Sequence, residues 1–301
     1  MLGPATTSLA VDLLLGEPPT ALHPTVAMGN WIAGGRRRRR ASQPIGAVLE
    51  GAATIATGMF LTAVVATLGD AMIEHAPSAR RGLVAGLALK PALSIRALVT
   101  AASRIERLLY ARRLGDARRA LSRDLVSRDT SRLSAAEVAG ATIESVAENL
   151  SDSFVGPLLA FRLDGVRGAY MYRFINTADA MLGYRTAELE WFGKPAARLD
   201  DLANLLPSRL TALLIAVTAM IGGGSTRRAM RVAVCDARRT ASPNAGWPMA
   251  AMAGALNVRL SKRGHYDLHS TARDPRARDI GHCCAIALGV SAIAALATDT
   301  L

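Results

Sequence analysis

The chain has 301 residues, and 50% of them are hydrophobic. Its mean hydropathy is +0.22 and its formal net charge is +12. This composition is too apolar for an ordinary soluble enzyme, and its low aromatic content of 4% leaves small and aliphatic residues to form surfaces where transmembrane helices approach closely. The positive charge lacks the interleaved aromatic residues or known module that nucleic-acid binding requires. We therefore expect an all-α fold, a polytopic membrane helical bundle, with no nucleic-acid partner.

Residues 1–15 form a short apolar run without a basic start or a convincing cleavage site, so we interpret it as a retained first segment and not as a signal peptide. The loop GEPPTALHP follows, and its prolines favour an extended path toward His23. An isolated histidine is as compatible with a structural role as with a functional one. Both interpretations of His23 stay open at this point.

Several apolar segments are long enough to cross a hydrocarbon core of roughly 30 Å. The clearest comes directly after five consecutive arginines at 36–40, which the positive-inside rule places on the cytoplasmic side. An arginine-rich segment at 103–140 is predicted to be a cytoplasmic helical region. The whole chain, 1–301, is expected to form one integral-membrane domain, and its predicted spans are about 45–69, 82–102, 145–163, 208–224 and 281–298.

Carboxylates, carboxamides and arginines recur between residues 144 and 209 within an apolar background, where ionisable groups are costly unless paired or bound to a ligand. On a helix, Glu144, Glu148 and Asp152 follow one another at i, i+4 and i+8 and repel one another. A Mg²⁺ ion or basic partners would turn that repulsion into attraction. The alternative is a structural network with arginines.

Further along, Asp200 and Asp201 stand beside Asn204, and pairs of such oxygen ligands suit Mg²⁺. The guanidinium groups of Arg198 and Arg209 match carboxylate or phosphate oxygens. Taken singly, however, Asp200 is equally compatible with a helix cap, and Arg198 with a surface ion pair.

Long strings resemble the CobD/CbiB family of cobalamin biosynthesis, the adenosylcobinamide-phosphate synthases. They are LLLGEPPTALHPTVAMG at 13–29, SRDTSRL at 127–133, IESVAENLSDSFVGPL at 143–158, YRFINTADAMLGYR at 172–185, FGKPAARLDDLANLLPSRL at 192–210 and SPNAGWPMAAMAGALNVRL at 242–260. They span nearly the whole chain in the family's order. Glu17, where Asp is common, and Ser127, where Gly is usual, are small departures from its pattern.

The resemblance implies ATP-dependent amide-bond formation between adenosylcobyric acid and an aminopropanol phosphate, or aminopropanol, in a multi-pass cell-membrane protein whose polar active site faces the cytoplasm. It implies MgATP as co-substrate, contact with membrane lipid, and a homo-oligomer as one option. We expect three groups of site residues: metal ligands Glu144, Glu148, Asp152, Asp200 and Asp201; phosphate or carboxylate clamps Arg128, Arg198 and Arg209; and substrate-orienting or catalytic residues Asn149, Asn176, Asp179, Asn204, Asn244 and His23. Asp179 and His23 are the alternatives for the base that accepts the amine proton.

The sequence contains no GxxxxGK[ST] phosphate loop, so the prediction that ATP is the co-substrate depends on the family resemblance alone. Two other functions stay open on the residues themselves. One is a Mg²⁺-dependent intramembrane transferase of prenyl or phospho-alcohol groups, and the other is a cation-coupled transporter with buried acids.

Overall fold

A computed structural model describes residues 2–41, 43–184, 186–222 and 224–300. The chain divides into two compact units, which we describe separately. Unit 1 comprises residues 1–94, 156–204 and 295–301, and unit 2 comprises residues 95–155 and 205–294.

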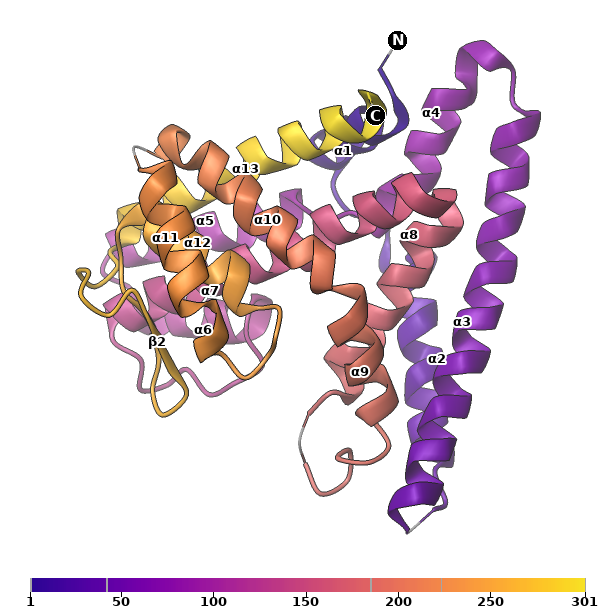
Figure 1. Cartoon of the computed structure of the whole chain (residues 1–301), viewed down its shortest axis with the longest axis horizontal. Helices are drawn as coiled ribbons and strands as arrows, with labels where there is room; N and C mark the ends of the chain where they lie inside the picture. The colour runs from indigo at the N-terminus through magenta and orange to yellow at the C-terminus, as the bar shows by residue number, and fades with distance from the viewer. Residues whose placement is uncertain (1, 42, 185, 223, 301) are drawn as a thin grey trace. The chain divides into compact units, whose positions relative to one another are not determined.

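All regular elements of unit 1 among its described residues are helices, joined by loops (Figure 1). Its core lies between α2, α3, α8 and α9, where Ile32, Ile55, Phe174 and Phe192 are buried together. The elements of unit 1 are α1 (Pro4–Leu15), η1 (Thr20–Leu22), α2 (Pro24–Arg38), α3 (Pro44–His75), α4 (Ser78–Leu89), η2 (Lys90–Ala92), α8 (Gly156–Leu182) and α9 (Lys194–Ala203).

The first helix of unit 1 is capped by a residue from the other end of the chain. Asp299 accepts hydrogen bonds from the backbone N–H groups of Ala5 at 2.8 Å and Thr6 at 2.9 Å, and from the Thr6 hydroxyl at 2.7 Å. A carboxylate at this position satisfies exposed amide donors and interacts favourably with the helix dipole. Figure 1 accordingly shows the labelled chain ends close together.

Helix α8 contains a sharp break at Gly165, whose φ of 59° and ψ of −153° are strongly unfavourable for residues with a Cβ. Asp70 on α3 caps the segment after the break, because its carboxylate accepts the amide hydrogens of Val166 at 2.9 Å and Arg167 at 3.1 Å. A Cβ on Gly165 would lie 2.8 Å from Asp70 Oδ1. The break therefore depends on both residues.

Unit 2 surrounds α12, a helix that is apolar on all sides and therefore central. It packs against α7, α10 and α11, and a two-stranded antiparallel hairpin lies beside it. The elements of unit 2 are α5 (Arg96–Tyr110), α6 (Leu114–Asp124), α7 (Ala135–Leu150), the π-helix η3 (Ser151–Val155), α10 (Leu205–Thr218), η4 (Ala219–Gly222), α11 (Thr226–Asp236), η5 (Ala237–Arg239), α12 (Gly246–Leu256), β1 (Leu260–Lys262), β2 (Tyr266–Leu268) and α13 (Ala277–Thr300), whose last residues belong to unit 1.

The helical fold class is confirmed, with the hairpin as an unpredicted addition. Within the described residues, α3 and α13 are long and apolar enough to cross a membrane, and two bent helix pairs raise the count to four if each is one span. These helices overlap the predicted spans at 45–69, 82–102, 208–224 and 281–298; residue 223 lies outside the described residues. The segment 145–163 is not among the candidate spans and instead runs from α7 through η3 into α8. Its crossing, like the cytoplasmic orientation, stays a prediction.

Candidate active site

The predicted site residues are divided between the two units, so each group is described within its own unit. In unit 2, a polar cavity of about 200 Å³ lies beside α7. Glu144, Glu148 and Asn149 line it from the helix, and Arg128 lines it from the loop before α7. The helical spacing thus brings Glu144 and Glu148 to one cavity, whereas Asp152, the third acid of that spacing, lies in the π-helix and does not line it.

Local hydrogen bonds fix the loop that carries Arg128. Ser145 on α7 donates its hydroxyl to the Leu125 carbonyl at 3.0 Å, and Thr130 donates to the Arg118 carbonyl at 2.9 Å. The α7 helix itself begins with a capping box formed by Ser134 and Glu137. The helix and the loop are therefore anchored on both sides of the cavity.

Glu144 is a buried and strongly perturbed acid of this cavity. Burial raises its pKa to about 8, because the charged carboxylate loses its hydration, and Arg128, whose guanidinium lies 3.8 Å from Oε2, only partly offsets this effect. Its Oε1 is buried and has no hydrogen-bond partner within the part of the chain that the structure describes. A buried carboxyl oxygen in this state is suited to a ligand that brings a donor or a cation.

The hairpin contributes two side chains to the same cavity. Lys262 and Tyr266 are cross-strand partners in the β1–β2 register, and both line the cavity. Burial, together with the charges of Glu144 and Glu148, raises the pKa of Tyr266, so its hydroxyl stays protonated as a donor. The cavity therefore combines carboxyl groups with a guanidinium, an ammonium and a phenol.

Arg209 and Asn244 form a second group in unit 2. Asn244 Oδ1 accepts a hydrogen bond from Arg209 Nη1 at 2.5 Å, and the Pro243 carbonyl accepts one from Nη2 at 3.2 Å. The guanidinium also lies over the Trp247 ring, 5.1 Å from its centroid. Both predicted residues are brought together here, on α10 and just before α12.

Unit 1 holds the predicted carboxamide group. Asn204 donates to Asp200 Oδ2 at 3.0 Å and accepts from the Tyr172 hydroxyl at 2.5 Å. Asn176 on α8 also hydrogen-bonds with Asp200. The structure thus joins three predicted residues from α8 and the end of α9 around one buried tyrosine.

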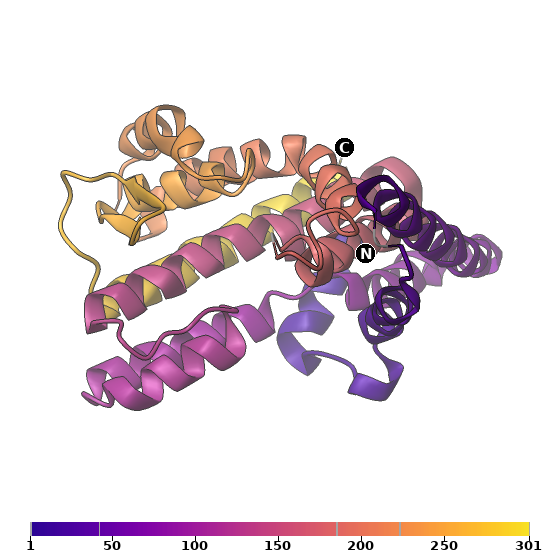
Figure 2. The same ribbon diagram turned by 90° about the horizontal axis from the view of Figure 1, so that it is seen from below.

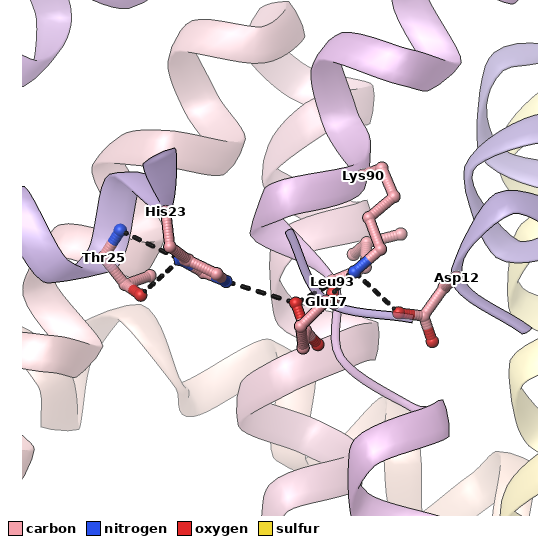
Figure 3. Close-up of polar contacts among 6 residues, drawn as sticks. All are labelled: Asp12, Glu17, His23, Thr25, Lys90 and Leu93. Atoms are coloured by element: carbon pink, nitrogen blue, oxygen red, sulfur yellow. Dashed lines mark hydrogen bonds and ion pairs between the residues drawn. The ribbon is translucent and has the colours of Figure 1, made fainter. Parts of the chain in front are cut away.

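His23 belongs to a partly buried ionic network, most of which Figure 3 shows. Its Nε2 lies 3.1 Å from Glu17 Oε2, and its Nδ1 accepts the Thr25 amide hydrogen at 3.3 Å. Lys90 lies 2.9 Å from the same Glu17 oxygen and 2.8 Å from Asp12 Oδ1. Both ring nitrogens of His23 are therefore engaged, and a role as base, which stays a prediction, requires Nδ1 to leave Thr25.

The ionic network sets the charge state of Glu17. Burial by itself would raise the pKa of this carboxyl, but hydrogen bonds from Ser94 and Lys90, the positive charge of Lys90 and the His23 contact hold it below its usual value. Glu17 is thus a carboxylate that joins the GEPPTALHP loop to η2.

Four other predicted residues are more exposed or stand apart. Arg198 pairs with Asp201 at 3.4 Å, one turn along α9, and the arginine side chain is 74% exposed. Asp179 is half-buried on α8, and Asp152 is half-buried in the π-helix. Their roles in binding stay predictions.

Residues 5–287 of the chain match the family described as CobD/Cbib protein. The chain belongs to the CobD/CbiB family. It is similar to the probable cobalamin biosynthesis protein CobD of Methanothermobacter thermautotrophicus, at 42% identity over 261 residues that cover 87% of this chain and 84% of the relative. The cobalamin biosynthesis protein CobD of Dehalococcoides mccartyi is 39% identical over 270 residues, 88% of this chain and 86% of the relative. The cobalamin biosynthesis protein CobD of Rhodobacter capsulatus is 37% identical over 300 residues, which cover 93% of this chain and 90% of the relative. No solved structure matches the chain.

Membership covers both units of this CobD/CbiB-family chain, so each group described above lies within the matched region. Several residues of these groups were not predicted from the sequence, among them Tyr172 beside Asn204. Lys262, Tyr266 and Trp247 lie within or beside the string 242–260, and Lys90 is one of three lysines in the chain. A lysine inside an apolar segment is a signal from which an ionic network could have been predicted.

The donors in the α7 cavity fit Mg²⁺ only with help from a ligand. Within the described ranges, no three His, Cys, Asp or Glu side chains lie close enough together to hold a metal ion. Mg²⁺ usually takes one or two carboxylates and completes its shell with water and phosphate. Glu144 and Glu148 meet that smaller requirement in the presence of a bound phosphate, and Glu144 Oε1 has no hydrogen-bond partner among the described residues.

Proposed function

We propose that this protein acts in cobalamin biosynthesis as an adenosylcobinamide-phosphate synthase, joining the free propionate carboxylate of adenosylcobyric acid to the amine of an aminopropanol phosphate at the expense of ATP. The observation that carries the proposal is the family match over residues 5–287. The α7 cavity supports it, because it offers both cationic and carboxyl groups to a phosphate-bearing substrate.

The proposed reaction has two balanced steps. The carboxylate oxygen attacks the γ-phosphorus of ATP, ADP leaves, and an acyl phosphate forms. The neutral amine then attacks the acyl carbon, inorganic phosphate leaves, and the nitrogen loses one proton to a base. The sum is one amide, ADP and hydrogen phosphate, which carries the proton that the amine nitrogen loses, and the product mass equals the two organic substrates less one water.

We assign the α7 cavity to the transferred phosphate. Arg128 and Lys262 would hold its oxygens by charge-assisted hydrogen bonds, and the protonated Tyr266 would donate another. Glu144 and Glu148 would hold Mg²⁺, which neutralises charge on the transferring phosphoryl group. A cation at this position also favours the ionised form of Glu144, against the effect of burial.

The proton acceptor and the orienting residues are proposed from unit 1. Asp179 and His23 remain the alternatives for the base, and His23 would have to release the Thr25 amide from Nδ1 to act as one. The carboxamides Asn176 and Asn204, held around Asp200, would orient the polar amide groups of a corrinoid.

Mass spectrometry of detergent-purified protein incubated with adenosylcobyric acid, aminopropanol phosphate and MgATP tests the proposal. We expect the condensed product, with one ADP released per amide. A well-folded sample that gives no product and no ADP with any amine of a panel would overturn it. Dependence on a lipid diphosphate, or ion-driven flux in liposomes, would favour the transferase or the transporter instead.

The location of the phosphate is tested separately with Arg128→Gln. Loss of a charge-assisted hydrogen bond of about 1.5–3 kcal/mol predicts a fall in kcat/KM of about ten- to a hundredfold. Arg132→Gln is the matched control, because this exposed arginine lies on the same loop outside the cavity. Equal activities of the two variants would remove the phosphate from the α7 cavity while leaving the reaction itself in place.

A further inference from the structure

A groove in unit 1 runs between α2 and α3 and has an apolar part and a basic part. The apolar part is a cavity of about 530 Å³ lined by α2, α3 and α8 together with Ala88, and its walls include Trp31, Leu61, Val65, Tyr170 and Phe174. The basic part is a cavity of about 270 Å³, which Arg38 and Arg39 line. Trp31 lines both cavities, so the two adjoin at this side chain.

The apolar part lies on a helix suited to lipid. Only 22% of the most apolar stretch of α3 is buried within the chain, and its exposed side chains include Phe60, Val64, Val65 and Leu68. Figures 1 and 2 show α3 and α2 side by side, α3 being the longer helix. The α3 residues that line the cavity extend from Gly58 to Gly69, about 17 Å by helical rise, which is roughly the depth of one hydrocarbon leaflet.

The charges at the other end favour an anion. Arg36 and Arg39 are engaged by Glu188 through its carboxylate and its carbonyl oxygen. Glu50, which also lines the basic cavity, accepts the backbone amides of Arg40 and Ala41 at 3.1 to 3.3 Å.

Within the described ranges, this leaves the side chains of Arg37, Arg38 and Arg40 outside any ion pair. Arg38 is the one of these three that faces the cavity. The free charge at this end of the groove is therefore positive.

We propose that the α2–α3 groove binds one anionic glycerophospholipid, with an acyl chain in the apolar cavity and the phosphate at Arg38 and Arg39. A neutral lipid would contact the apolar walls but would gain no charge attraction from Arg38 and Arg39. Cationic side chains at a membrane surface each favour anionic lipid by about 1 kcal/mol, which corresponds to about a fivefold change in affinity. This site does not depend on the proposed amide synthesis and shares none of its residues.

Native mass spectrometry of the full chain in detergent, titrated with phosphatidylglycerol or phosphatidylcholine of identical acyl chains, tests the proposal. We expect each chain to retain one phosphatidylglycerol molecule tightly and to bind phosphatidylcholine more weakly. Arg38→Gln should lower the affinity for phosphatidylglycerol about fivefold and leave the affinity for phosphatidylcholine unchanged. Arg80→Gln, which removes an exposed charge from α4, is the matched control and should change neither affinity.

A second variant fills the apolar part. A Cβ on Gly69 would approach Val166 Cγ1 at 3.9 Å, an ordinary contact, so Gly69→Leu places its side chain in the groove without a clash. We expect Gly69→Leu to lower the affinity for both lipids. Gly34→Leu is the control, because a Cβ there meets nothing within 4 Å and Gly34 lines neither cavity.

Three results would overturn the proposal. The first is equal affinity of the chain for the two lipids. The second is full binding of phosphatidylglycerol by Gly69→Leu at an unchanged melting temperature. The third is a dimer of this chain that Gly69→Leu dissociates. The last result would assign the groove to a second copy.

Discussion

Glu144 should make the protein less stable as the pH rises. Its pKa is about 8 in the folded chain and 4.5 as the ordinary value, so between these pH values the folded state binds the proton that the unfolded state has released. Stability therefore falls as pH rises through this window, and the fall ends above pH 8. With about 1.36 kcal/mol per pKa unit, the loss from pH 5 to pH 8 is on the order of 3–4 kcal/mol.

Glu144→Gln removes this titration while keeping the shape of the side chain. Thermal unfolding in detergent with EDTA, measured from pH 5 to pH 8 for both proteins, should show a variant that gains stability relative to the parent as pH rises. Glu148→Gln is the matched control one turn away on α7. A constant difference in stability across this pH range would refute the conclusion that burial keeps Glu144 protonated.

Three further predictions follow from features described above. Lys90→Met should lower the free energy of unfolding by about 3–5 kcal/mol in denaturant titrations, because two acids lose their buried cation; Lys194→Met, at a half-exposed pair, should cost under about 1 kcal/mol. Gly165→Ala should cost about 1–3 kcal/mol through backbone strain and the approach to Asp70, whereas Gly34→Ala should raise the melting temperature slightly. Magnesium should raise the melting temperature of the ATP-loaded parent more than that of Glu144→Gln, and equal shifts would place the ion elsewhere.

The parts of the site that depend on local periodicity could be predicted from the sequence. Glu144 and Glu148 share a helical face because the spacing of four residues requires it. The apolar length of 45–69 likewise predicted the position of α3. These inferences need only the geometry of one helix.

The parts that depend on tertiary packing could not be predicted in the same way. The Arg209–Asn244 bond joins α10 to the loop before α12, and nothing in either segment specifies the other as its partner. Lys262 and Tyr266 reach the α7 cavity through a hairpin that is too short to give a clear alternating pattern. His23 looked isolated because its ionic network is completed by Lys90 from a different helical segment.

The cap that Asp299 provides has a consequence for the order in which the chain folds. Proteins are made from the N-terminus, so the first helix leaves the ribosome long before the carboxylate that satisfies its amides at Ala5 and Thr6 has been synthesised. Until then, the start of α1 depends on water or on another partner for those hydrogen bonds. Unit 1 therefore reaches its final form only after residue 299 has been synthesised, and a substitution of Asp299 would act on the junction that completes the first helix.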